Sequence, residues 1–325
     1  MASVTSLTSA QIAGLPTSII AALTTANVSS LTTAQLAALT SAQLAALGTT
    51  NVTALASGSL SALTSTALAG LSAAEASVLT TGQITSLGSA QLAALGTAAI
   101  AGLGTGVTAL GTAAFTGLTS AQLAAFTTAE AAALTTAQAS VLSSTQIKGL
   151  SSADMANLTT QAVSVLTTAS LAALTSAQLA ALTTDDMGTL ASANLSALNT
   201  AALAGLTSAQ VAALDTKVLG LQTAQFAALT SQAIVGLTTG AATGLTTADV
   251  VALTISETAA LSTDAVAAFL STQITSFTST QIPALTSTQI SALTSTQVGY
   301  LTGTQVGYLT DTQIGWMSTA QQNAL

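Results

Sequence analysis

The sequence predicts an all-α solenoid of very short capped helices, with one helix in each eight-residue repeat. Three observations lead to this prediction. An apolar residue, usually Leu, recurs every eight residues along the chain. The next residue is of a type that caps helix N-termini in most repeats. Three positions further on stands Gln, Glu or Asp. Repetition at a fixed short period indicates a repeat architecture rather than one or two ordinary globular domains.

The repeat begins at the apolar anchor, and its positions are counted one to eight as L-T-[ST]-A-Q-[LIV]-A-A. Anchors run from Leu7 to Leu325, and only two intervals, Leu103 to Leu110 and Leu214 to Leu221, have seven residues. We therefore expect residues 1–325 to form a single continuous array of about 40 octads, with register breaks near 103–110 and 214–221. Fourteen repeats separate the breaks. Because this number is even, it favours two helices, and thus two octads, in each coil.

Each octad contains the signals of a helix start. Position 2 is Ser, Thr, Asn or Asp in 30 of 40 repeats, and position 5 is Gln, Glu or Asp in 24 of the 38 full octads. Together they form the capping box, and positions 1 and 6 have the spacing of the hydrophobic staple. All ten acidic residues fall at the cap or in the first turn, where the helix dipole favours them. The adjacent Asp185 and Asp186 are accordingly interpreted as capping residues rather than an acid–base pair.

Helix ends and the core follow from the same repeat. A helix of about six residues has no stability alone, so neighbouring helices must bury positions 1 and 6. Glycine at position 8 predicts a left-handed residue that ends the helix. It occurs at Gly14, Gly70, Gly102, Gly117, Gly149, Gly205, Gly236 and Gly244.

The alternative fold is a β-solenoid, which hydroxyl-rich short repeats also build. In a strand, positions 1 and 6 would point to opposite faces. Ala, Gln and Leu also favour helix over strand. Pro283, at position 7 of a regular octad, counts against a helix there, because its missing amide falls inside the expected helix.

Composition argues against several functions. Only two lysines and no arginine accompany a net charge of −8, which argues against nucleic-acid binding. Without His or Cys, imidazole and thiolate metal sites and the common nucleophile–base pairs are excluded, and we expect no cofactor and no enzymatic activity. Polar residues interrupt every apolar run, so no membrane span is expected. The start, MASVTSLTSAQ, lacks the pattern of a cleaved signal peptide.

Three aromatic residues are the candidate functional residues. Tyr300, Tyr308 and Trp316 occupy position 8 in three successive octads of a chain with only eight aromatics. They predict either an end cap that fills space or a contact with another subunit, since aromatics are enriched at interfaces. Carbohydrate stacking is a third interpretation. If successive repeats alternate around the coil, Tyr300 and Trp316 share one face.

The recurring L-T-[ST]-A-Q-[LV]-A-A-L of residues 31–47 and 174–182 resembles repeats of large, Ala- and Thr-rich bacterial surface or secreted structural proteins. The resemblance implies a structural role outside the cell or at its surface, with export that needs no cleaved N-terminal signal peptide. We therefore expect a self-assembling protein, its partner being itself, that forms a filament, tube, sheath or surface layer. The alternative is a binding module, either an adhesin stalk that contacts a cell surface or carbohydrate, or an ice-binding solenoid with ranked Thr side chains.

Overall fold

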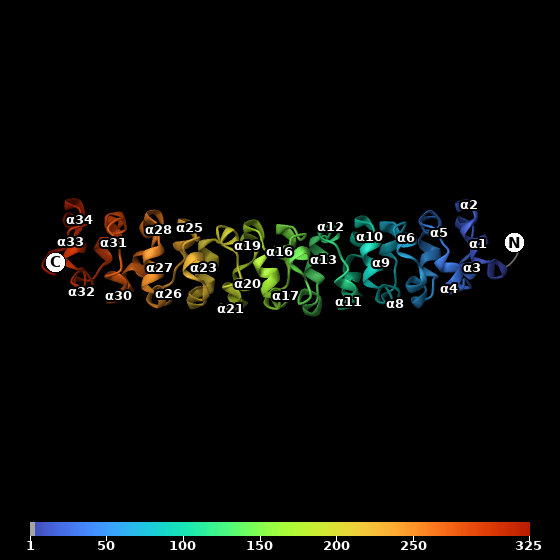
Figure 1. Cartoon of the computed structure of the whole chain (residues 1–325), viewed down its shortest axis with the longest axis horizontal. Helices are drawn as coiled ribbons and strands as arrows, with labels where there is room; N and C mark the ends of the chain where they lie inside the picture. Colours follow the sequence, from blue (N-terminus) through green and yellow to red (C-terminus); the bar gives the residue numbers. More distant parts are fainter. Residues whose placement is uncertain (1–3) are drawn as a thin grey trace. The chain divides into compact units, whose positions relative to one another are not determined.

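The computed structural model describes residues 4–325, which contain helices and no strand. The chain divides into two compact units, Met1–Ser170 (unit 1) and Leu171–Leu325 (unit 2). Within each unit, one short helix forms in almost every repeat (Figure 1). The prediction of an all-α solenoid with one helix per repeat is confirmed for the described residues, and the β-solenoid alternative is wrong.

The helices of unit 1 are α1 (Ser9–Ala13), α2 (Thr17–Ala21), α3 (Thr25–Ser29), α4 (Thr33–Ala37), α5 (Ser41–Thr53), α6 (Ser65–Leu68), α7 (Ala73–Ser77), α8 (Thr81–Thr85), α9 (Ser89–Ala94), α10 (Thr97–Gly102), α11 (Thr112–Phe115), α12 (Ser120–Leu123), α13 (Thr128–Ala133), α14 (Thr136–Ala139), α15 (Ser144–Ile147), α16 (Ser152–Asn157) and α17 (Thr160–Ser164). Its 3₁₀ helices are η1 (Val4–Ser6), η2 (Ser57–Ala62) and η3 (Gly104–Ala109). Helix α5 holds two repeat helices, which are separated by a kink at Gly48, where φ is 74° and ψ is 166°.

Helix α18 (Thr168–Ala172) contains the boundary between the units. The helices of unit 2 are α19 (Ser176–Ala181), α20 (Thr184–Thr189), α21 (Ser192–Leu195), α22 (Thr200–Leu203), α23 (Ser208–Leu214), α24 (Thr223–Phe226), α25 (Ser231–Ile234), α26 (Thr239–Gly244), α27 (Thr247–Ala252), α28 (Ile255–Ala260), α29 (Thr263–Ala267), α30 (Ser271–Ile274), α31 (Ser287–Ala292), α32 (Ser295–Val298), α33 (Gly303–Val306), α34 (Asp311–Trp316) and α35 (Thr319–Gln322). Its 3₁₀ helices are η4 (Asp215–Gly220) and η5 (Ile282–Ala284).

The helix starts are the capping boxes that the sequence predicts. At α5, the Gln43 backbone N–H donates to Thr40 Oγ1 at 3.2 Å, and the Thr40 backbone N–H donates to Gln43 Oε1 at 2.9 Å. Acidic residues serve in the same way: the Thr183 backbone N–H donates to the Asp186 carboxylate at 2.9 Å, so Asp186 is a capping residue as expected. Each cap satisfies backbone donors that a helix start otherwise leaves unpaired.

Positions 1 and 6 form the core, as predicted. Leu44 and Leu179 at position 6 have no exposed surface, and the anchors Leu47 and Leu182 are also buried. Pro283 is accommodated because its repeat forms the 3₁₀ helix η5 in place of an α-helix. The cap of that repeat is kept, since the Thr278 backbone N–H donates to Gln281 Oε1 at 2.9 Å.

The prediction that position-8 glycines are left-handed is wrong. Among the described glycines, only Gly48 and Gly104 have positive φ, and neither is at position 8. Most position-8 glycines instead permit close packing of one coil on the next. A Cβ placed at Gly70, Gly102, Gly117, Gly149, Gly205 or Gly236 would lie 1.9–2.4 Å from the carbonyl oxygen of a first-turn residue 28 or 29 positions earlier. Only a residue without a Cβ fits that approach.

The two seven-residue repeats share one structural solution. Each forms a six-residue 3₁₀ helix, η3 or η4, instead of an α-helix. In each, position 2 has a positive φ, of 53° at Gly104 and 46° at Asp215. Asp215 has ψ of −133°, outside the left-handed α region, so its backbone is strained. The missing residue is therefore absorbed by a tighter helix and one unusual backbone angle.

Candidate functional site

A ladder of glutamine side chains joins successive coils within each unit. Every rung is a position-5 Gln whose amide nitrogen donates to two carbonyl oxygens of the preceding coil. Gln43, for example, bonds Ile12 at 2.8 Å and Leu15 at 2.9 Å, which lie 31 and 28 residues earlier. Rungs are Gln35, Gln43, Gln83, Gln91, Gln122, Gln138 and Gln146 in unit 1 and Gln210, Gln225, Gln273, Gln281, Gln289, Gln297, Gln305, Gln313 and Gln321 in unit 2.

The ladder fixes the size of the coil. In unit 2, α34 packs on α31, which lies three repeats earlier. The Gln313 side chain of α34 bonds Ile282, in the fourth repeat back, and Leu285, the anchor of the third. Each helix thus lies between two helices of the preceding coil, and the 28-residue spacing gives three and a half octads per coil. The expectation of two helices, and thus two octads, per coil is wrong. The physical reason is that each helix packs between two helices of the preceding coil, so the chain returns to the same side only after three to four repeats.

The dual use of these glutamines is the functional feature that sequence reasoning missed. The capping box explains the Oε1 contact, but Glu would serve there equally well. A carboxylate cannot also donate to the preceding coil, whereas an amide can. A signal was present, because Gln outnumbers Glu and Asp by 18 to 6 at position 5.

At two of the position-5 carboxylates, Glu130 and Asp186, one oxygen is buried without a hydrogen-bond partner. Glu130 is fully buried, and its Oε1 has no hydrogen-bond partner. Burial raises the pKa of the Glu130 carboxyl; hydrogen bonds from Thr127 and the Gly104 backbone oppose this rise, whereas the charge of Asp154 adds to it. Asp186 Oδ1 is likewise buried without a partner. The described residues contain no group of three or more metal-ligating side chains.

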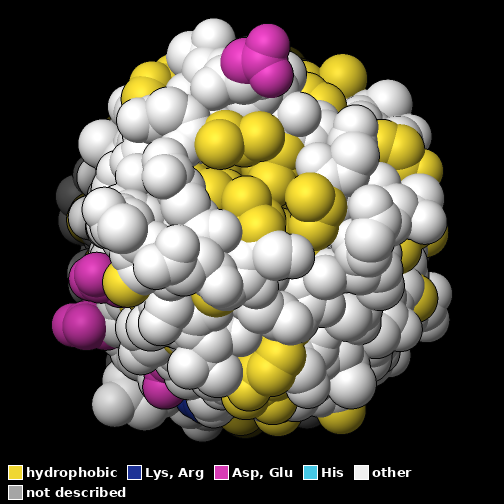
Figure 2. Space-filling model, turned by 90° about the vertical axis from the view of Figure 1, so that its left-hand side faces the viewer, with side chains coloured by type: hydrophobic (Ala, Val, Ile, Leu, Met, Phe, Trp, Pro, Cys, Tyr) yellow, Lys and Arg dark blue, Asp and Glu magenta, His cyan; other side chains and the backbone are white. Residues whose placement is uncertain are grey.

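The ladder stops in the last coil of unit 2. The anchor carbonyl oxygens of Leu301 and Leu309 accept no hydrogen bond within residues 4–325, whereas the equivalent carbonyls of Leu285 and Leu293 accept from Gln313 and Gln321. Core side chains are also uncovered there: Leu301, Val306, Leu309 and Ile314 are only half-buried. Figure 2 shows a hydrophobic cluster at the centre of this end, framed by uncharged polar side chains and backbone. We call the surface formed by Leu301, Val306, Leu309 and Ile314 the end face.

The three predicted aromatic residues surround this last coil on different sides. Tyr300 and Trp316 are each 39% exposed, and Tyr308 is half-buried. Tyr300 and Trp316 lie two repeats apart in a coil of three and a half repeats, so the expectation that they share one face is wrong. Tyr300 lines a pocket of about 520 Å³ that also includes Phe269 and Leu270.

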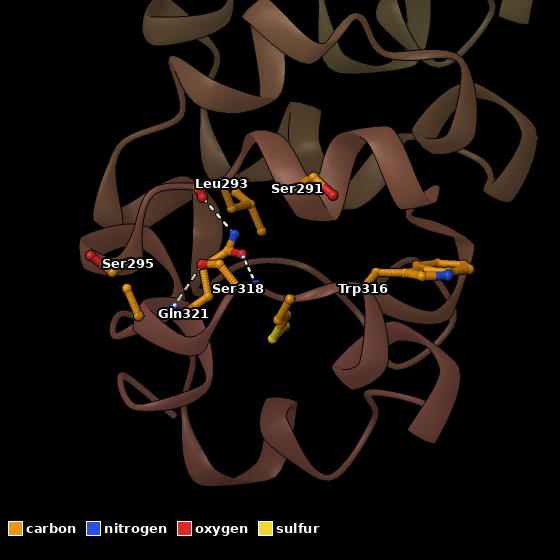
Figure 3. A pocket seen from close by; sticks show the side chains of 8 residues that line it. Ser291, Leu293, Ser295, Trp316, Ser318 and Gln321 are labelled. Carbon is orange, nitrogen blue, oxygen red and sulfur yellow. Dashed lines mark hydrogen bonds between the residues drawn. The ribbon is translucent and has the colours of Figure 1, made fainter.

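Trp316 lines a separate pocket of about 320 Å³ with Ser291, Leu293, Ser318 and Gln321. Figure 3 shows the indole directed away from Gln321, whose side chain bonds the Leu293 carbonyl at 2.7 Å and the Ser318 backbone N–H at 2.8 Å. The Gln321 amide is therefore already bonded on both its nitrogen and its oxygen. Whether the rings act as an end cap or as a subunit contact stays a prediction.

Comparison with known proteins supports a repeat protein. A family model described as the ALTTAQ repeat matches residues 20–57, 148–184 and 184–216. These segments cover about a third of the chain, and the described residues continue the same repeat beyond them. No curated protein and no solved structure matches the chain. None of the helices in residues 4–325 has the length and apolar character needed to cross a membrane, in line with the expectation of no membrane span.

Proposed function

We propose that this protein is a self-assembling structural protein that forms a filament, tube, sheath or surface layer outside the cell. The observation that carries the proposal is the end face. It presents position-1 and position-6 side chains, which interior coils bury against the next coil. A surface that copies an interior packing face is suited to receive another coil of the same kind.

Physical arguments favour association through this face. Contiguous exposed apolar patches mark interaction sites, and a solenoid coil whose outer face is apolar tends to stack on another coil. Contact between two different surfaces of identical chains generates open filaments when the rotation does not close. The net charge of −8 is spread over 325 residues, which is too dilute to keep subunits apart.

Location and activity belong to the same proposal. An extracellular or cell-surface site is supported by the resemblance of the repeat to those of surface and secreted proteins. Catalytic activity is not expected, because the chain has no His or Cys and its paired acids cap helices. The principal partner is the protein itself.

Ice binding is less well supported. It needs flat ranks of Thr hydroxyls facing outward, but position-2 hydroxyls are turned to their own helix: Thr286 Oγ1 accepts from the Gln289 backbone N–H at 3.3 Å. Thermal hysteresis of the purified protein is expected to be absent, and a clear hysteresis would favour the binding-module alternative.

The proposal is tested by sedimentation velocity and negative-stain microscopy of the purified chain and of Leu309→Asp. The wild type is expected to form ordered polymers. The charge introduced at half-buried Leu309 should abolish them while circular dichroism stays helical. Val251→Asp, at a side chain 49% exposed elsewhere on unit 2, is the matched control and should still polymerise. A wild type that remains monomeric over a wide concentration range contradicts the proposal.

A further inference from the structure

Beside the end face, one side chain of the last repeat makes the hydrogen bonds that a ladder glutamine of a following coil would make. Position 6 is apolar in the consensus, but the last repeat has Gln322 there. The Gln322 amide nitrogen donates to the carbonyl oxygens of Ile314 at 2.9 Å and Met317 at 3.3 Å. These are a position-6 and an anchor carbonyl, the pair that a ladder glutamine of the next coil bonds elsewhere. Gln322 therefore completes one rung from within the chain and leaves Leu301 and Leu309 open.

The first coil of unit 1 shows the opposite deficiency. Gln11 forms its capping box with Thr8, but its amide nitrogen has no hydrogen-bond partner within residues 4–325. Gln11 is exposed, whereas the rungs of later coils are almost all buried. The Asn27 side chain likewise uses only its oxygen, which accepts from Thr24, and its amide nitrogen has no hydrogen-bond partner within residues 4–325. In the repeat between those of Gln11 and Asn27, position 5 is Ile19. Its side chain has no hydrogen-bond donor and is 38% exposed.

These two ends match in one register. When Gln11 is placed 28 residues after Leu309, as ladder glutamines are placed after their anchors, Ile19 falls opposite Met317. Ile19 has no donor, and the Met317 carbonyl needs none because Gln322 already bonds it. A shift of one octad toward Leu301 would leave the Leu309 carbonyl facing Ile19 without a donor. The first register is therefore the one in which the donor of Gln11 meets an open carbonyl and donor-less Ile19 meets a carbonyl that is already bonded.

We propose that the end face of unit 2 binds the first coil of unit 1 of a second copy, with Gln11 of that copy donating to the Leu309 carbonyl. The inference rests on the proposed self-assembly and specifies its contact. The half-exposed side chains of the end face would pack against the first coil as anchors pack between coils inside each unit. The contact between the two copies has the same geometry as the contact between successive coils of one unit. It therefore requires no new kind of interaction.

Interior geometry supplies a cross-linking test of the register. Position 4 of one repeat lies against position 3 of the third repeat before it: a Cβ at Gly82 would be 3.1 Å from the Ser57 Cβ. Disulfides join Cβ atoms about 3.5–4.5 Å apart, so small adjustments permit a bond. In the proposed register, Ala10 of one copy lies against Asp311 of the other. In the register shifted by one octad, Ala10 lies against Gly303.

The chain has no cysteine, so single-cysteine variants react only at the chosen site. Ala10→Cys protein and Asp311→Cys protein, mixed under mild oxidation, should give a disulfide-linked dimer that neither variant gives alone. Ala10→Cys mixed with Gly303→Cys is the matched control and should give at least tenfold less. Gly303 and Asp311 are both exposed first-turn residues, and a Cβ at Gly303 meets no atom within 4 Å. Ser57→Cys with Gly82→Cys in one chain should form an intramolecular bond that verifies the interior geometry.

The remaining outcomes separate this inference from the proposed function. Preferential cross-linking of Ala10→Cys to Gly303→Cys overturns the register. Polymers seen by microscopy with no cross-link in either mixture overturn end-to-end docking but leave self-assembly standing. If sedimentation shows only monomers and neither mixture cross-links, both the docking contact and the proposed self-assembly are wrong.

Discussion

The side-chain amide of Gln146 donates to the backbone carbonyl oxygens of Phe115 at 3.1 Å and Leu118 at 2.9 Å, while its oxygen accepts the Ser143 backbone N–H at 3.0 Å. One side chain thus caps its own helix and attaches it to the coil before. Because the contact recurs along both units, local helix formation and coil stacking depend on the same residue.

Replacing such a rung should destabilise the coil strongly. Gln146→Met keeps the volume but leaves buried carbonyls and the cap N–H without partners, each costing about 1–3 kcal/mol. The lowered free energy of unfolding can be measured by chemical denaturation, and faster amide exchange should be confined to neighbouring coils. Gln161→Met, at an exposed position 4, is the control. Equal effects of the two substitutions would show that the ladder contributes nothing.

Close approach at position 8 gives a second prediction. In Gly205→Ala the new Cβ would lie 2.1 Å from the Ser176 carbonyl oxygen, so the coils must separate. Overpacking of this kind costs about 1–3 kcal/mol or more. Gly315→Ala, inside α34 where a Cβ meets no atom within 4 Å, should be neutral or stabilising by up to about 1 kcal/mol. Thermal unfolding compares the pair, and a neutral Gly205→Ala would contradict the packing assignment.

Glu130 predicts a pH dependence of stability. Burial raises the pKa of this carboxyl above its ordinary value, so the folded state holds the proton more tightly than the unfolded state. Its contribution is therefore fully present below the unfolded-state pKa and is lost as pH rises through the folded-state pKa. Glu130→Gln cannot titrate. The free energy of unfolding of Glu130→Gln minus that of wild type should increase from pH 4 to pH 7, and a difference that is constant or decreases opposes the assignment.

The aromatic residues of the last coil give a prediction about assembly. The combined variant Tyr300→Ala, Tyr308→Ala and Trp316→Ala should weaken polymerisation, because aromatic side chains are frequent anchors at interfaces. Its helical circular dichroism should be retained, since two of the rings are 39% exposed. Loss of folding would favour the end-cap interpretation. Unchanged polymers would remove all three rings from the contact.

The sequence by itself determined the local structure of this protein. Each helix start is encoded within four neighbouring residues, as at Thr40 to Gln43, and the eight-residue period separates core anchors such as Leu47 from surface positions. These properties depend on contacts three or four residues apart. They could therefore be predicted without knowing how the coils close, and so could the position of the three aromatic residues in the final repeats.

Only the tertiary structure decided the properties that link residues about 28 positions apart. The coil size, the opposite sides taken by Tyr300 and Trp316, and the close approach at Gly205 depend on where one coil meets the next. The sequence does not distinguish a position-8 glycine that ends a helix with a left-handed backbone from one that permits close approach of a neighbouring backbone. Likewise, Gln at position 5 satisfies its local cap in either case, and only the preceding coil shows what its amide nitrogen binds.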